Sequence, residues 1–177
     1  MSIITPEIEY VDRSIESIRY LEHGWPSDLC RWHSHREFEL HLIVATRGKA
    51  FVGDYIGEFR PGSLFLTGPY LPHNWVTDEI TSRQVSTRDM LVQFDQESVN
   101  SLSLAFPEFD DMRPMFELAC SGIEFDGFDA KLVQRRLAAI RDSSGPSRIL
   151  VFLQLRVEIN QHANMRQLSV AAVTQPE

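Results

Sequence analysis

Short apolar runs separated by turn residues occupy the sequence from residue 32 to about residue 95, and this pattern constrains the fold more than any other. The runs are rich in β-branched and aromatic residues, and Gly, Pro and Asp interrupt them. Runs of this kind are typical of strands joined by tight turns. Many short strands at even spacing predict a barrel or a sandwich. The predicted strands cover residues 37–46, 49–53, 55–60, 63–67 and 89–94, with a weaker candidate at 75–85.

Helical periodicity follows residue 95. From Met112 to Cys120, apolar side chains recur at intervals of three and four residues, as one buried stripe of a helix requires. Asp110 or Asp111 is the predicted N-cap of this helix. Gly122 is expected to take the left-handed conformation just past its last turn.

Two more helices are predicted over residues 129–142 and 146–162. The apolar surface of the second is broader than one core-facing stripe needs. It can pack on the β half, pair with a second copy across a two-fold axis, or do both with different sides. Residues 164–177 lose periodicity and are interpreted as a tail or linker.

Composition excludes several classes of protein. Asp and Glu total 25 against 17 Lys and Arg, so the formal net charge is -8 and the surface repels the phosphates of nucleic acid. The two cysteines, Cys30 and Cys120, have no metal-binding spacing, which suits a reducing cytoplasm. Neither a secretory signal nor a membrane-spanning run is present, so we expect a cytoplasmic protein that does not bind membranes.

Ionisable side chains recur at every second residue from His33 to His41. Because successive side chains of a strand point to opposite faces, this pattern predicts two different faces. On an outer strand the polar face would simply meet solvent. The predicted polar face holds His33, His35, Glu37, Glu39 and His41, and the predicted apolar face holds Phe38, Leu40 and Leu42.

A second signal lies at residues 61–75, where a turn, a strand and another turn precede His73 and Trp75. The His-x-His-x-x-x-Glu pattern of residues 33–39 and the later Pro-x-x-x-His pattern together resemble the two motifs of the cupin family. The resemblance implies a cupin-type double-stranded β-helix, that is, a jelly-roll barrel.

The cupin resemblance also implies a set of metal ligands inside the barrel, namely His33, His35, Glu39 and His73. Imidazole and carboxylate ligands of this sort suit zinc, nickel, manganese or iron. A hydrogen-bonded polar pocket without metal explains the same residues, and this alternative stays open.

A more specific resemblance involves residues 35–40, 48–54 and 64–75. It also includes Phe106-Pro107-Glu108-Phe109 and Gly122-Ile123-Glu124-Phe125. These stretches are similar to the N-terminal effector domain of AraC-type transcription regulators. In that family the barrel is followed by helices and then by helix-turn-helix motifs, which this sequence lacks. Two departures affect the turns before His73, because Ser63 stands where Asp is commoner and Tyr70 stands where Gly or Asn would adopt a positive φ more easily.

These resemblances imply three parts: an N-terminal arm and cupin barrel over residues 1–95, a helical dimerisation segment over 96–165 and a tail over 166–177. The expected function is that of a sensor rather than an enzyme, in a homodimer that contacts DNA only through a C-terminal domain absent from this chain. The alternatives are a metal-dependent cupin enzyme, such as a dioxygenase or sugar isomerase, and an interaction module without a working pocket. A small polar effector, sugar-like by family analogy, is expected in a pocket lined by His33, His35, Glu37, Glu39, His41, His73 and Trp75.

Overall fold

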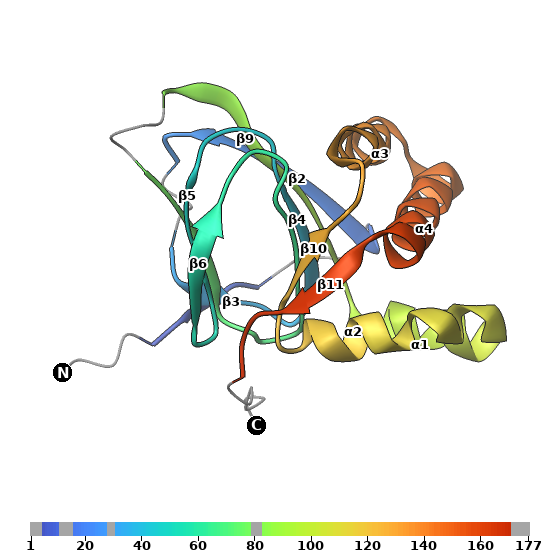
Figure 1. The fold of residues 1–177 in the computed structure, drawn as a ribbon. Helices are drawn as coiled ribbons and strands as arrows, with labels where there is room; N and C mark the ends of the chain where they lie inside the picture. The colour runs from blue at the N-terminus through green and yellow to red at the C-terminus, as the bar shows by residue number, and fades with distance from the viewer. Residues whose placement is uncertain (1–4, 11–15, 28–30, 79–82, 171–177) are drawn as a thin grey trace.

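The structure, a computed structural model, describes residues 5–10, 16–27, 31–78 and 83–170. These residues form two sheets and four α-helices, so the prediction of a mostly β chain with C-terminal helices is confirmed. One sheet has five strands in the order β1-β3-β8-β5-β6, and the other has six in the order β11-β10-β7-β4-β9-β2. Figure 1 shows the two sheets facing each other, with the helices outside the six-stranded sheet.

The strands are short, as their Gly- and Pro-containing turns require. The five-stranded sheet contains β1 (Glu7–Ile8), β3 (His33–Ser34), β5 (Gly48–Val52), β6 (Tyr55–Phe59) and β8 (His73–Thr77). The six-stranded sheet contains β2 (Ile18–Trp25), β4 (Phe38–Ile43), β7 (Leu64–Thr67), β9 (Val85–Phe94), β10 (Ile123–Asp126) and β11 (Asn164–Gln167).

The helices follow β9, and most of them begin and end at recognisable signals. They are α1 (Gln96–Ala105), α2 (Arg113–Ala119), which a 3-10 turn (Pro107–Met112) precedes, α3 (Ala130–Asp142) and α4 (Gly145–His162). Asp95 caps α1 through Ser98 N–H, and Asp129 caps α3 through Lys131 N–H. No helix among the described residues has the length and apolarity needed to cross a membrane.

The helix predicted over 112–120 exists, but its predicted cap is wrong. Met112 is the N-cap residue and makes no side-chain cap bond, while Asp110 pairs with Arg113 at 2.6 Å. The 3-10 turn explains the difference, because it leads directly into α2 and removes the need for an Asx cap. Gly122 has a φ of 73°, as its position after the last turn predicts.

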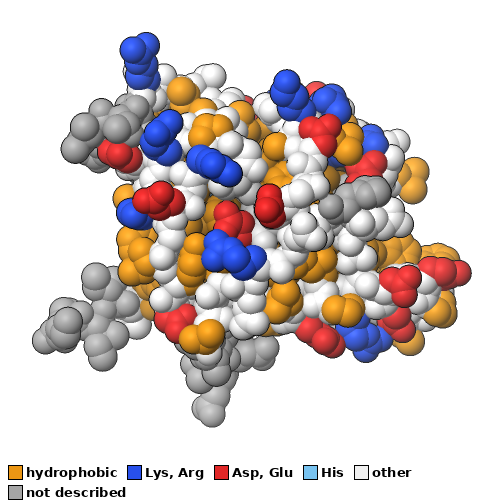
Figure 2. All heavy atoms as spheres, in the orientation of Figure 1, with side chains coloured by type: hydrophobic (Ala, Val, Ile, Leu, Met, Phe, Trp, Pro, Cys, Tyr) orange, Lys and Arg blue, Asp and Glu red, His pale blue; other side chains and the backbone are white. Residues whose placement is uncertain are grey.

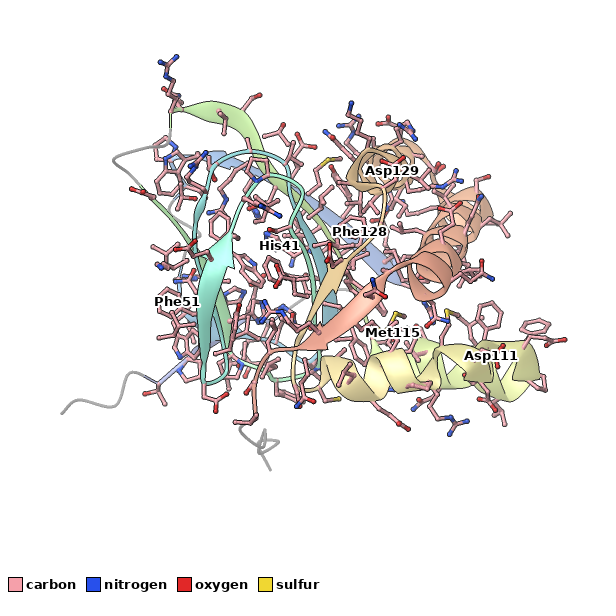
Figure 3. The ribbon with its side chains drawn as sticks, in the orientation of Figure 1. His41, Phe51, Asp111, Met115, Phe128 and Asp129 are labelled. Carbon is pink, nitrogen blue, oxygen red and sulfur yellow. The ribbon has the colours of Figure 1, made fainter. Side chains whose placement is uncertain are left out.

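Two apolar clusters lie on opposite faces of the six-stranded sheet. The outer cluster joins Phe38, Leu40 and Phe94 of the strands to buried residues of α2, α3 and α4. The inner cluster lies between the sheets and consists of Ile43, Ala50, Val52, Phe59, Phe65, Leu71, Trp75 and Leu168. In Figure 3, His41 lies between the two sheets, whereas Met115 lies on α2.

A buried arginine belongs to the outer cluster. Arg156 of α4 is 3% exposed, and its guanidinium carbon lies 4.7 Å from the ring centre of Phe116 and 5.3 Å from that of Phe152. Cation–π contact and the aliphatic stem allow a charged residue to occupy this position. The apolar side chains of α4 have two different environments. Phe152, Leu155 and Ile159 are buried, whereas Leu150 is 67% exposed.

The prediction of a single strand through residues 33–41 is wrong. His33 and Ser34 form β3 in one sheet, the chain bends at residues 36 and 37, and β4 begins at Phe38 in the other sheet. The bend thus carries the chain across the interior, and the two halves of the motif approach from opposite walls.

The interpretation of residues 164–177 as a tail is wrong at its start, because Asn164–Gln167 form strand β11. β11 pairs with β10, and β10 pairs with β7, so both strands extend the six-stranded sheet. After β11, Leu168 is buried in the inner cluster and Ser169 donates to Asp54 at 2.7 Å. These contacts are long-range pairings that local periodicity does not reveal.

Candidate metal centre

Three histidines and one glutamate converge between the two sheets. His33 lies on β3, His35 follows it, Glu39 lies on β4 and His73 begins β8. One ligand atom from each of the four residues lies within 4.8 Å of all the others, so this buried cluster could hold a metal ion. His33 and His73 are direct partners across β3 and β8, with ring centres 4.4 Å apart.

The main chain orients all three imidazoles. The Nδ1 atoms of His33, His35 and His73 lie 2.8 Å, 3.1 Å and 2.8 Å from the carbonyl oxygens of Arg31, Glu37 and Leu71. Because a carbonyl only accepts, each Nδ1 carries a hydrogen and each Nε2 is directed to the cluster. Histidines that bind metals commonly have this support on the second nitrogen.

Glu39 is the centre of the hydrogen-bond network. Its Oε2 atom lies 3.1 Å from His35 Nε2 and accepts from Gln93 Nε2 at 3.0 Å, and its Oε1 atom lies 2.9 Å from His41 Nδ1. Burial alone would raise the pKa of Glu39, but hydrogen bonds from His35 and His41 and the nearby His73 imidazole hold it well below its usual range. The carboxylate is therefore ionised.

The histidines of the cluster differ in charge. Burial, together with the nearby His73 imidazole, lowers the pKa of His33 to about 4, so the ring is neutral at pH 7. For His35, burial acts to lower the pKa, but the hydrogen bond to Glu39 and the charges of Glu39, Glu37 and Glu9 together outweigh burial, and the pKa is raised. A metal ion at this position would replace the Nε2 hydrogen of His35 and keep the attraction to Glu39.

His73 has an unused ligand atom. Its side chain is buried, and no described residue forms a hydrogen bond with its Nε2 atom, which lies 3.6 Å from Glu39 Oε1. A buried nitrogen without a partner is costly, and a bound ion would satisfy it. Ligands about 2.1 Å from a transition metal are separated by about 3 to 4.2 Å, so the four donors need only a small contraction.

A second polar group supports Glu39 from behind. His41 Nε2 lies 3.4 Å from Asp89 Oδ2, and Asp89 is also 2.8 Å from His23 Nδ1 and accepts from Arg88 Nε at 2.7 Å. Burial alone would lower the pKa of His41, but the charges of Asp89 and Glu39 and the hydrogen bonds to them together raise it. His41 therefore acts as a hydrogen-bonded support of the carboxylate rather than as part of the converging set.

A pocket of about 150 Å³ adjoins the cluster. Of the seven residues predicted to line an effector pocket, His33, Glu39, His41 and Trp75 line this one, whereas His35, Glu37 and His73 are buried without lining it. No histidine of the described residues shows on the face drawn in Figure 2, in agreement with an interior site. The other lining residues are Glu9, Arg19, Leu21, His23, Arg31, Asn74, Arg88, Leu91 and Gln93.

The sequence reasoning missed Gln93 and Asp89, although the signal was present. Residues 89–94 were predicted as a strand, and its alternation places Asp89, Leu91 and Gln93 on the face that does not carry Phe94. Glu9 and His23 could not be placed in the same way, because Glu9 directly follows β1 and His23 lies on β2, and neither strand was predicted from the sequence.

The turn before His73 forms despite its unusual residue. Tyr70 has a φ of 60°, which few residues other than Gly and Asn adopt, and its N–H donates to the carbonyl oxygen of His35 at 2.7 Å. The hydrogen bond links the two motif segments directly.

A comparison with known protein families gives no match for this chain, and a comparison with curated protein sequences gives none either.

Proposed function

We propose that this chain is the ligand-sensing and dimerisation domain of an AraC-type transcription regulator, built on a cupin-type barrel. The observation that carries the proposal is the buried cluster of His33, His35, Glu39 and His73 beside a small polar pocket in the interior. Its acceptors and donors suit a small polar effector such as a sugar or sugar acid. DNA would be bound by a further domain of a longer protein.

The contacts of β4 provide a route from the pocket to the helices. Glu39 faces the pocket, and its neighbour Phe38 packs against Phe94 at 5.5 Å and against Phe116 of α2 at 5.2 Å between ring centres. An effector that binds one arrangement of β4 more tightly than another would shift the helices. The exposed Leu150 of α4 supports pairing with a second copy of the chain.

A reporter assay tests this proposal. The chain is fused to a DNA-binding domain that recognises its operator only as a dimer, and a panel of pentoses, hexoses and their aldonic acids is added. We expect operator binding that one class of sugar alters, and loss of that response in the variant with His33→Ala and His35→Ala while sedimentation still shows a dimer. A monomer at high concentration would remove the proposal.

A second candidate, a metal-dependent cupin enzyme, is favoured by the unpaired Nε2 of His73. A bound metal ion would act as a Lewis acid on a substrate, with His33, His35, Glu39 and His73 as its ligands. Elemental analysis of protein purified without chelators separates the two candidates. Near-stoichiometric zinc, nickel, manganese or iron that is lost in the His33→Ala, His35→Ala variant supports the enzyme.

A further inference from the structure

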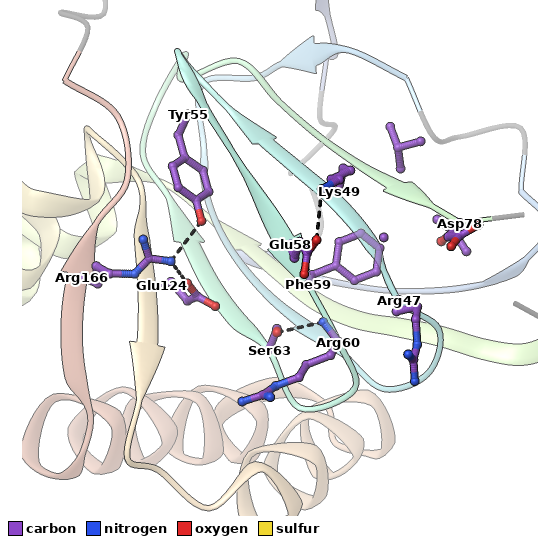
Figure 4. A pocket seen from close by; sticks show the side chains of 13 residues that line it. Arg47, Lys49, Tyr55, Glu58, Phe59, Arg60, Ser63, Asp78, Glu124 and Arg166 are labelled. Atoms are coloured by element: carbon purple, nitrogen blue, oxygen red, sulfur yellow. Dashed lines mark hydrogen bonds and ion pairs between the residues drawn. The ribbon is translucent and has the colours of Figure 1, made fainter. Parts of the chain in front are cut away.

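A hollow of about 1000 Å³ lies outside the histidine cluster, and none of the four cluster residues lines it. It is lined by residues of β5, β6 and the end of β8, together with Glu124 of β10 and Arg166 of β11 (Figure 4). Val76, which is 42% exposed, supplies most of the apolar surface, and Phe59 also lines the hollow although it is only 2% exposed. The hollow thus has the size of a small-molecule site.

The charged side chains of this hollow are of two kinds, those with a partner and those without, and Asp78 is among the first. Lys49 pairs with Glu58 at 3.1 Å, and Arg166 donates to Tyr55 at 3.0 Å and also pairs with Glu124. Their charges are therefore balanced within the protein.

Arg47 and Arg60 differ from these pairs. No hydrogen bond or ion pair joins either guanidinium group to another described residue, and both line the hollow. Figure 4 shows the two side chains at the same end of it. Two unpaired cations lining one hollow are unexpected in a chain whose net charge is -8, because carboxylates are abundant.

The backbone holds both arginines in place. Thr46, directly before Arg47, has a φ of 70°, which is a rare conformation for a β-branched residue, and its Oγ1 lies 3.3 Å from Thr77 Oγ1. At Arg60 the N–H donates to Ser63 Oγ at 3.1 Å. Fixed backbones reduce the entropy that a ligand contact would otherwise cost.

We propose that this hollow binds a small organic oxyanion. A carboxylate or phosphate group would pair with the guanidinium groups of Arg47 and Arg60, which suit planar, bidentate recognition of such groups. The apolar or aromatic body of the ligand would lie against Phe59 and Val76. The site is separate from the pocket beside Glu39 and goes beyond the proposed function.

Isothermal titration calorimetry with three probes tests the site: phenyl phosphate, inorganic phosphate and phenol. We expect phenyl phosphate to bind more tightly than inorganic phosphate, and phenol not to bind measurably. Raising the salt concentration should weaken the binding of phenyl phosphate, since the contact is between exposed charges. Equal affinities for the two phosphates would overturn the part of the proposal that assigns Phe59 and Val76 to the ligand.

Matched variants identify the residues. Arg47→Gln and Arg60→Gln should each lower the affinity for phenyl phosphate by about three- to tenfold, because each removes a charge-assisted contact at an exposed site. Arg135→Gln removes one exposed charge from α3, where Arg135 lies 3.8 Å from Asp129 and outside the hollow, and should leave the affinity unchanged. Equal loss in all three variants, or no loss in the first two, overturns the proposal.

A last variant separates this site from the histidine cluster. His33→Ala should bind phenyl phosphate as the unaltered protein does, since His33 does not line the hollow. Loss of binding in folded His33→Ala protein, checked by circular dichroism, would assign the oxyanion to the interior pocket instead.

Discussion

The two faces of the six-stranded sheet are made by the same strands and both carry an apolar cluster, yet only the inner face also buries the cluster of ionisable side chains. On β4, Phe38 and Leu40 belong to the apolar cluster under the helices, whereas Glu39 and His41 form hydrogen bonds in the interior. β9 repeats the division with Phe94 outside and Gln93 inside. Strand alternation alone therefore separates a packed scaffold from a polar site, and the two faces should respond differently to substitution.

The largest effect on stability is expected on the outer face. Phe38→Ala removes a ring that is 0% exposed and contacts Phe94 and Phe116, so it should lower the free energy of unfolding by about 3–5 kcal/mol. Urea denaturation measures this change. A loss below about 1 kcal/mol would contradict the close packing of this face.

Metal affinity should distinguish two buried histidines of the inner face. His73→Ala removes a converging donor and should weaken zinc binding by more than about 100-fold. His41→Ala removes only a support of Glu39 and should cost about 10- to 100-fold. Competition with a chromogenic chelator measures both, and equal losses would show that His41 is itself a ligand.

A smaller effect is expected for Glu39→Gln in the metal-free protein. The substitution keeps the shape but removes the charge that His35 and His41 contact, so the free energy of unfolding should fall by about 1–3 kcal/mol. Glu58→Gln on the exposed strand β6 is the matched control and should change stability little. Similar results for both variants would mean that the interior network contributes nothing.

The smallest effect concerns the helices that cover the outer face. Asp129→Ala removes the N-cap of α3, whose side chain accepts from Lys131 N–H at 2.9 Å, and should cost about 1 kcal/mol. Thermal unfolding of this variant beside Lys131→Ala, an exposed change on the same helix, measures it. Metal affinity should stay unchanged in both, which keeps the two faces distinct.

The sequence predicts strands β4, β5, β6, β7 and β9, helices α2, α3 and α4, and the residues of the cluster, but not how these residues come together. Period-two alternation identified Glu39 and His41 as one face, and the structure buries both. It could not reveal the bend at residues 36 and 37, since two short strands in different sheets have the same local pattern as one longer strand.

Other features depend on contacts between distant segments. β10 and β11 join a sheet whose other strands end at Phe94, and each is only four residues long, too short for its pattern alone to predict a strand. Arg156 was not expected in a core, because the helical pattern gives no sign that three phenyl rings surround it. Tertiary packing decides both features.

The carbonyl contacts of the three cluster imidazoles have a consequence for how this site can change. Since backbone oxygens of Arg31, Glu37 and Leu71 aim the rings, replacing those side chains leaves the aiming groups in place. The interior can therefore exchange neighbouring side chains, and with them its preference for one guest over another, while the three nitrogens keep their direction. Such a pocket is a suitable starting point for redesigned recognition.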